Sequence, residues 1–133
     1  MSTTDISKLV TYWVSDVLGP DIDVAYGCFT RRADACIVKA SPGEPWVRRY
    51  LSGGGVRRFG YEVYLRVMPR GDEGPRIDAL ARLRLLQRAV ESGECPDGVS
   101  VRSHEVTSLP AQYATEQDGA VTYQMQATIT YMA

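Results

Sequence analysis

The sequence predicts a single α+β domain, in which a twisted, mainly antiparallel sheet with a long hairpin is covered by two helices. Three observations support this prediction. Two segments repeat apolar residues at the three- and four-residue spacing of an amphipathic helix, and residues 121–131 alternate apolar and polar residues as a half-buried strand does. Three consecutive glycines, at 53–55, stand between two strand-like segments. A chain of 133 residues can bury one core without disulfide staples.

The first helix is expected over "STTDISKLVTYWVSDVLGP". Thr3 or Thr4 can cap its start, and Gly19 followed by Pro20 ends it. Its apolar face consists of Ile6, Leu9, Val10, Trp13, Val14, Val17 and Leu18. We expect this face to pack on the core.

Residues 22–40 contain two strand-like pieces on either side of a polar, turn-like stretch from Thr30 to Asp34. This arrangement predicts a β-hairpin whose register the sequence leaves open.

The second helix, "PRIDALARLRLLQRAVESGE", is expected to begin at Pro75 and to end at Gly93. Its broad apolar face consists of Ile77, Leu80, Ala81, Leu83, Leu86, Ala89 and Val90. Its arginines fall mainly on the other side, so we expect that side to face solvent.

The carboxy-terminal segment has the clearest strand pattern of the chain. Its predicted core face is Val121, Tyr123, Met125, Ala127, Ile129 and Tyr131, and its uncharged polar face is Thr122, Gln124, Gln126, Thr128 and Thr130. Residues 99–108 are expected to pair with it in antiparallel fashion, connected by a loop over residues 109–120.

The glycine stretch "YLSGGGVRRFGYEVYLR" does not fit a phosphate-binding loop. A GxGxxG fingerprint from Gly53 would need glycine where Arg58 stands, and a Walker motif from Gly55 would need Lys and Ser or Thr where Tyr61 and Glu62 stand. A hairpin turn centred on Gly53 and Gly54 explains the glycines better, because glycine reaches positive φ without steric cost.

This register places Arg49 opposite Arg58 and Arg48 opposite Phe59. It also puts Arg48 and Arg57 on the sheet face that carries Trp46, Phe59, Tyr61, Val63, Leu65 and Val67, with the tip projecting past the core. The like-charge pair disfavours an isolated hairpin and favours an acidic partner. Two interpretations stay open: solvated arginines, or an arm that contacts another subunit or DNA.

Composition and motifs give little support to catalysis. Charged residues make up 23% of the chain and the net charge is −1, which favours neither disorder nor a strongly basic nucleic-acid binder. Asp21 and Asp23 lack the rest of a calcium loop, and His104 and Glu105 are neighbours on a predicted strand, so they point to opposite faces. We assign no catalytic residue, no metal and no cofactor, and expect that the protein is not an enzyme.

Cysteine usage and hydropathy suggest an intracellular protein. Cys28, Cys36 and Cys95 have no CxxC spacing, and we expect reduced, buried thiols. Neither a basic leader with an apolar run nor a membrane-spanning segment is recognisable, so we expect synthesis in the cytosol and no membrane partner.

Assembly is suggested by two polar surfaces. The Thr/Gln face of the last strand and the glycine hairpin lack the lysines and prolines that often protect exposed sheet edges. Identical subunits could pair through them, and a heterologous interface can close into a ring.

The segment "PWVRRYLSGGGVRRFGYEVYLR", followed by a helix and then by "HEVTSLPAQYATEQDGAVTYQMQATITYMA", resembles the phage minor capsid family, whose members are similar to tail terminator proteins of long-tailed (siphovirus-type) phages. The resemblance covers roughly residues 45–133 and rests on the order and spacing of the aromatic-glycine hairpin and of Tyr123, Gln124, Gln126 and Tyr131.

The resemblance implies a virion structural protein, assembled in the host cytoplasm into a ring of identical subunits, a hexamer in such families. This ring ends tail-tube polymerisation, contacts the tail tube protein and the head-tail connector protein, and passes DNA through its lumen without sequence-specific binding. The implied subunit or partner interface is Arg48, Arg49, Gly53, Gly54, Arg57, Arg58, Gln124 and Gln126, with Arg49 and Arg58 facing the lumen. Two alternatives are a head-completion or neck adaptor and a small nucleotide-acting or nucleic-acid-binding protein.

Overall fold

The computed structural model describes residues 5–19, 22–27, 35–43, 46–51, 53–68, 74–117 and 119–132. Its elements in chain order are α1 (Ile6–Leu18), β1 (Asp23–Tyr26), β2 (Ala35–Ala40), β3 (Trp46–Arg49), β4 (Gly55–Val67), α2 (Gly74–Glu91), β5 (Ser100–Thr115) and β6 (Val121–Met132). Neither described helix is long and apolar enough to cross a membrane.

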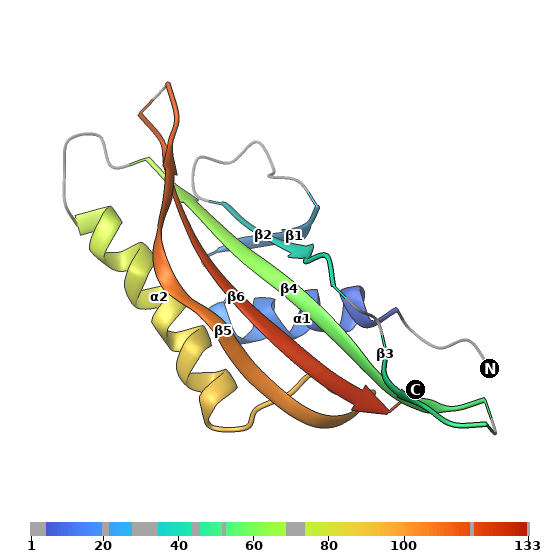
Figure 1. Cartoon of the computed structure of the whole chain (residues 1–133). Helices are drawn as coiled ribbons and strands as arrows, with labels where there is room; N and C mark the ends of the chain where they lie inside the picture. The colour runs from blue at the N-terminus through green and yellow to red at the C-terminus, as the bar shows by residue number, and fades with distance from the viewer. Residues whose placement is uncertain are drawn as a thin grey trace.

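The strands form a six-stranded sheet in the order β1-β2-β4-β6-β5, and β3 pairs with the part of β4 that β2 does not reach (Figure 1). All described pairings are antiparallel except that of β1 with β2. Strands β4 and β6 pair over their whole lengths, from Val56 opposite Met132 to Val67 opposite Val121. The predicted α+β class, with a mainly antiparallel sheet and a long hairpin, is confirmed.

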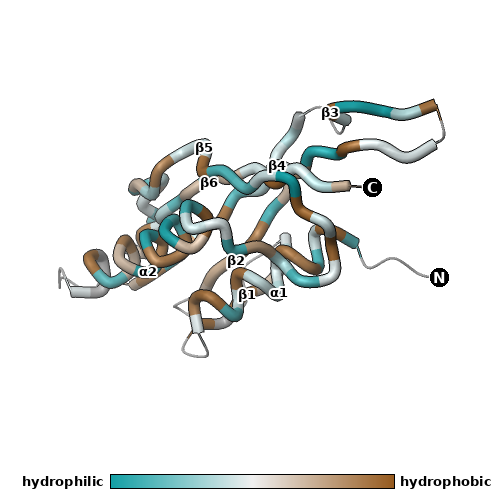
Figure 2. Tube along the Cα trace, turned by 90° about the horizontal axis from the view of Figure 1, so that it is seen from below, coloured by the Kyte–Doolittle hydropathy of each residue, from teal (hydrophilic) through white to brown (hydrophobic). Residues whose placement is uncertain are grey.

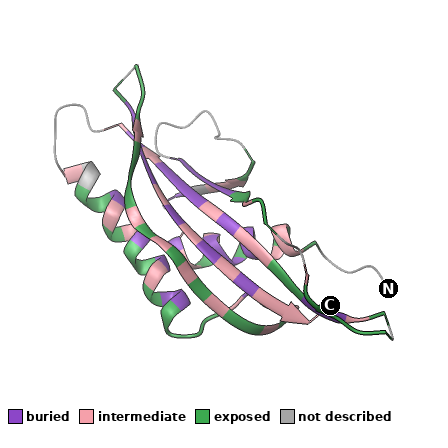
Figure 3. Cartoon of the chain, in the orientation of Figure 1, coloured by how far each residue is buried: buried purple, intermediate pink, exposed green. Residues whose placement is uncertain are grey.

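Both helices lie on one side of the sheet, as the view from below shows (Figure 2). Their apolar faces and one face of the sheet form a single core. Its largest fully buried side chains include Tyr61, Leu65, Leu83, Leu86, Met125 and Ile129. Neither of the two described helices lies on the other face of the sheet, and along β4 and β6 buried residues alternate with more exposed ones (Figure 3). The predicted alternation of the last strand is confirmed, except that Tyr131 is only half-buried and Thr122 is buried.

The N-cap of helix α1 is Asp5, one or two residues later than the threonines proposed for this role. The Asp5 side chain caps it by accepting a 2.8 Å hydrogen bond from the backbone N–H of Ser7. Asp5 can do this because a short side-chain oxygen reaches the unpaired N–H groups of the first turn. Gly19 ends the helix as predicted, with φ of 90°. Thr3, Thr4 and Pro20 lie outside the described residues.

The predicted hairpin over residues 22–40 is wrong, because β1 and β2 are parallel, with Val24 opposite Cys36. A hairpin turn reverses the chain, whereas here the second strand starts level with the first and runs in the same direction. β2 instead pairs in antiparallel fashion with β4, where Cys36 and Val38 join the core beside Leu65 and Val63. The turn-like stretch from Thr30 to Asp34 lies outside the described residues.

The glycine hairpin forms, but its predicted register is wrong. Trp46 pairs with Arg57, and after an irregularity Arg48 pairs with Val56 and Arg49 with Gly55. The extra residue in β3 exchanges the faces of the two arginines, so Arg49 rather than Arg48 shares a face with Trp46. Arg49 therefore does not stand opposite Arg58, and the predicted like-charge pair is absent from the β3–β4 ladder.

Two further expectations need correction. The expected loop over residues 109–120 is mostly strand, because β5 continues to Thr115 and several bulges let it bend with β6, including one around Pro110. On α2 the buried stripe is narrower than predicted: Ile77 is 61% exposed and Ala81 is exposed, whereas Ala79 is buried. One face of a helix contacts one layer, so only its central stripe reaches the core.

Candidate functional site

The β3–β4 hairpin extends beyond the body of the protein (Figures 1 and 2). We call residues 46–58 the arginine arm. At its end Leu51 is fully exposed at 110%, while Val47 and Tyr50 are also exposed. The tip is closed by hydrogen bonds from Tyr50 N to Gly54 O (2.7 Å) and from Gly53 N to Tyr50 O (3.0 Å). Gly53 has φ of 100°, which only glycine adopts without strain. The predicted projection of the tip is confirmed.

Two arginine side chains stack on the Trp46 ring. The guanidinium carbons of Arg57 and Arg49 lie 4.2 Å and 4.9 Å from the ring centroid. Such cation–π contacts orient a guanidinium while leaving its N–H donors available. Arg48 and Arg58 are exposed on the opposite face of the arm. The arm therefore carries four exposed cationic groups on a short stretch of sheet.

Gly55 is essential to this geometry. A Cβ atom there would lie 2.2 Å from the backbone oxygen of Arg48 and 3.0 Å from Cζ3 of Trp46. The missing side chain lets the indole lie over the backbone of β4, as an aromatic ring covers a glycine in other sheets. The absence of a side chain at residue 55 thus sets the position of the Trp46 ring, on which both arginines stack.

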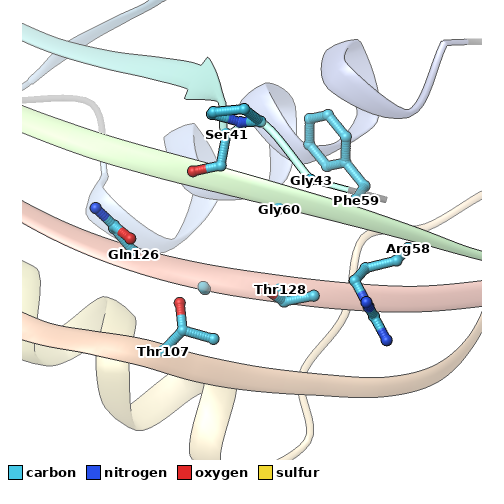
Figure 4. Close-up of a pocket in the computed structure, with 10 residues that line it drawn as sticks. Ser41, Gly43, Arg58, Phe59, Gly60, Thr107, Gln126 and Thr128 are labelled. Carbon is cyan, nitrogen blue, oxygen red and sulfur yellow. The ribbon is translucent and has the colours of Figure 1, made fainter. Parts of the chain in front are cut away.

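The open sheet face contains a hollow of about 380 Å³ beside the base of the arm (Figure 4). It lies over Gly60, where no side chain fills the space, and Ser41, Arg58, Thr107, Gln126 and Thr128 surround it. Its lining is mixed: hydroxyls, one amide and the single positive charge of a guanidinium stand beside the apolar Pro42, Phe59 and Ala127. It is suited to a polar or anionic side chain of a partner.

Next to the hollow, a hydrogen-bonded network is centred on Glu62. Its carboxylate accepts from Ser41 Oγ at 2.8 Å, from Gln124 Nε2 at 3.2 Å and from the Tyr64 hydroxyl. Burial alone would raise the pKa of Glu62, but these hydrogen bonds and nearby Lys39 outweigh it and hold the pKa below its ordinary value. Burial and the adjacent carboxylate raise the pKa of Tyr64. The network thus links side chains of strands β4 and β6 to each other and to Ser41.

His104 lies on the helix-covered side, where its ring contacts Trp13 and Tyr61 at centroid distances of 5.0 Å and 5.8 Å. Its Nδ1 is 3.0 Å from the backbone oxygen of Glu94, and its Nε2 is 2.5 Å from the Tyr61 hydroxyl. A carbonyl can only accept, so Nδ1 carries the proton and Nε2 accepts from Tyr61. Burial lowers the pKa of His104, and the Glu94 hydrogen bond opposes this only in part.

The pair formed by His104 and Tyr61 has the geometry of a structural hydrogen bond. Tyr61 is completely buried, and burial, together with the thiolate form of nearby Cys95, raises its pKa. Both groups are therefore neutral near pH 7 and satisfy each other's hydrogen bonds at the edge of the core. His104 and Glu105 do point to opposite faces, since the half-buried His104 ring contacts Tyr61 on the helix-covered side and Glu105 is exposed.

Of the described cysteines, Cys36 and Cys95 are free thiols. Cys36 is buried as expected, and burial raises its pKa to about 12, whereas Cys95 is only partly buried. Cys28 and Asp21 lie outside the described residues. Within the part of the chain that the structure describes, no group of three His, Cys, Asp or Glu side chains is placed to hold a metal ion.

The structure brings the predicted interface residues to two places. Arg48, Arg49, Gly53, Gly54 and Arg57 lie on the arginine arm, and Arg58 lies where the arm meets the hollow. On the open face Gln126 lines the hollow, while Gln124 hydrogen-bonds Glu62 at 3.2 Å and Tyr64 at 2.9 Å. Their role in an interface stays a prediction.

Sequence reasoning missed three features of these surfaces: the stacking of Trp46, the Glu62 network and the His104–Tyr61 pair. The alternation Gly60, Glu62, Tyr64 along one strand places a carboxylate and a phenol on one face, and this signal could have indicated the network. The other two features depend on a bulge and on segments 43 residues apart, which no local pattern reveals.

Comparison of the chain with models of known protein families and with curated protein sequences gives no match.

Proposed function

We propose that this protein is a structural subunit of a phage tail, a tail terminator or minor capsid protein that forms a ring of identical subunits at the head-proximal end of the tail tube. The ring stops tube polymerisation and joins the tail to the head connector in the virion. The resemblance of residues 45–133 to this family, set out under Sequence analysis, supports the proposal.

One structural observation carries the proposal furthest: the arginine arm extends from the core with Leu51 fully exposed at its tip. A projection with an exposed apolar end and stacked arginines has more exposed apolar surface than a monomer needs. Exposed apolar groups beside polar ones are typical of protein interfaces. The open sheet face with its polar hollow gives a second contact surface.

In this proposal the partners are other copies of the chain, the tail tube protein and the head-tail connector protein. Arg48, Arg49, Arg57 and Arg58 contribute to subunit contacts, and Gln126 contributes to a contact on the open face. Arg49 and Arg58 lie on opposite faces of the arm, so the one that faces the lumen contacts DNA through its phosphates, without reading its sequence.

The test is the mass of the protein by light scattering over a concentration series, with electron microscopy of any oligomer and of mixtures with tail tubes. We expect a closed ring with a central hole, and shorter tubes when the protein is added during tube polymerisation. A compact closed dimer without a hole, together with unchanged tube length, would contradict the proposal. A ring that binds the connector but leaves tube length unchanged would favour the neck adaptor.

A second candidate function, nucleic-acid binding, is favoured by the exposed Arg49 and Arg57 on the Trp46 ring, because arginine and aromatic side chains together form platforms for bases and phosphates. Binding of single- and double-stranded DNA over a salt series tests it. This candidate would be supported over a ring subunit if the monomer bound DNA with an affinity that falls steeply with salt. The double variant Arg49→Ala with Arg57→Ala should then lose this salt-dependent binding. A nucleotide-dependent activity lost in His104→Ala would instead indicate an enzyme.

A further inference from the structure

We infer that copies of this chain associate head to tail, with the arginine arm of one copy docking on the acidic β5–β6 hairpin of the next. This inference rests on the proposed function, because it names the two surfaces through which the subunits would contact each other. By the acidic hairpin we mean residues 105–126.

The two hairpins carry opposite charge. Residues 46–61 contain four arginines and no acidic residue. The β5–β6 hairpin carries Glu116 and Asp118 at its turn in the sequence and Glu105 farther along β5, opposite Thr128, and residues 103–133 contain neither lysine nor arginine. The whole chain has a net charge of −1, so this separation of charge is a feature of the two hairpins rather than of the overall composition.

The two hairpins also lie at opposite ends of the molecule. Strands β4 and β6 pair from Val56 opposite Met132 to Val67 opposite Val121. The tip of the arm precedes the first of these pairs and the β5–β6 turn precedes Val121, so a ladder of about 37 Å separates the two tips. Figure 1 shows the β3–β4 tip and the β5–β6 tip pointing away from each other. One copy therefore cannot bring its own two hairpins together.

Exposed apolar side chains accompany the charges on both hairpins. Val47, Tyr50 and Leu51 are exposed on the arm, and Leu109 and Tyr113 are 64% and 59% exposed on β5. Both surfaces thus offer apolar contact area with charges beside it, which is the usual composition of a protein interface. At the acidic tip Glu116 is exposed, and its backbone is fixed by hydrogen bonds to Gly119 and Ala120.

Two different surfaces at opposite ends of one chain form a heterologous contact, which repeats from copy to copy until it closes into a ring or grows as a filament. A second copy is the partner that fits, because every copy offers both the basic and the acidic surface. The stacking of Arg49 and Arg57 on Trp46 holds the two charges in place before contact, which reduces the entropy lost on docking.

The test is a charge swap measured by light scattering at low salt. We expect Arg49→Glu or Glu116→Arg alone to weaken association about tenfold or more, and the double variant Arg49→Glu with Glu116→Arg to recover it. Arg84→Glu on α2 and Glu91→Arg at its end are matched controls, because both residues are exposed and lie on neither hairpin. Association of the wild type should weaken between about 0.1 M and 1 M salt, where the Debye length falls from about 10 Å to 3 Å.

Amide chemical shifts of the wild type in a concentration series give a readout that needs no closed ring. Shifts at both hairpins support the inference, even if the assembly is an open filament, an outcome that would contradict the ring proposal alone. A closed ring that is indifferent to both single variants would overturn the inference and leave the proposed function standing. Absence of concentration-dependent shifts at the hairpins would overturn it as well.

Discussion

Replacing Tyr61 by Phe tests the buried hydrogen bond between strands β4 and β5. Tyr61 is completely buried, and its hydroxyl is 2.5 Å from His104 Nε2. The substitution keeps the ring and its packing and removes only the donor, so the acceptor on the half-buried His104 loses its partner at the edge of the core. Leaving a buried polar group unsatisfied costs about 1 to 3 kcal/mol. We therefore expect Tyr61→Phe to lower the free energy of unfolding by that amount, and the melting temperature by about 3 to 5 °C for each kcal/mol.

The reciprocal variant, His104→Leu, leaves the Tyr61 hydroxyl without its acceptor and should cost a similar amount. Glu94 is exposed, so water can replace His104 at its backbone oxygen. The double variant removes both polar groups and leaves neither unsatisfied, which is nearly neutral where shapes match. We expect the double variant to lose less stability than the two single variants lose in sum. The difference, about 1 to 3 kcal/mol, is the coupling energy of the pair.

Urea unfolding followed by circular dichroism at pH 7.5 measures all four members of this cycle. The denaturant dependence of the unfolding free energy should stay the same, because none of the substitutions changes the surface exposed on unfolding. Strict additivity of the two single effects would refute the reasoning, since it would mean that the two groups do not depend on each other in the folded protein.

Three further predictions concern pH, the arm and the helix cap. Because burial lowers the pKa of folded His104, the unfolded chain takes up the proton first as the pH falls below about 6.5. The unfolding free energy of the wild type should therefore decrease relative to that of His104→Leu between pH 7.5 and 5. An unchanged difference between the two across this range would contradict the assigned cause. Gly55→Ala places a Cβ 2.2 Å from the Arg48 backbone oxygen and should detach β3, seen as loss of protection from hydrogen exchange at the amides of Arg48 and Arg49. The control Gly60→Ala places its Cβ 3.2 Å from Ser41 Cβ and should leave β3 in place. Equal protection in both variants would be evidence against the close approach at Gly55. Asp5→Ala removes the N-cap of α1 and should cost about 1 kcal/mol in thermal or urea unfolding, while Asp16→Ala, exposed on the same helix, serves as the control.

The sequence determined the elements that depend on local periodicity. The alternation from Val121 to Tyr131 indicated β6 and its core face, and the spacing from Val10 to Leu18 indicated α1, because a residue's neighbours at two, three and four positions decide which face it occupies. The three glycines between strand-like segments indicated the β3–β4 hairpin and its projecting tip. The charges of the two hairpins are likewise visible in the sequence, although their positions are not.

Only the tertiary structure decided the pairing of strands. β1 pairs with β2 in parallel, β2 pairs with β4 in antiparallel fashion, and one extra residue in β3 places Arg49 rather than Arg48 on the face of Trp46. The length of β5 followed from its pairing with β6, which extends through a stretch whose proline and small polar residues indicated a loop. Register, partner and direction are fixed by contacts between residues far apart in the chain, and a one-residue shift moves every side chain to the other face. For this reason the local pattern indicates which segments form strands, whereas the charged surfaces and the His104–Tyr61 pair exist only once those strands have assembled.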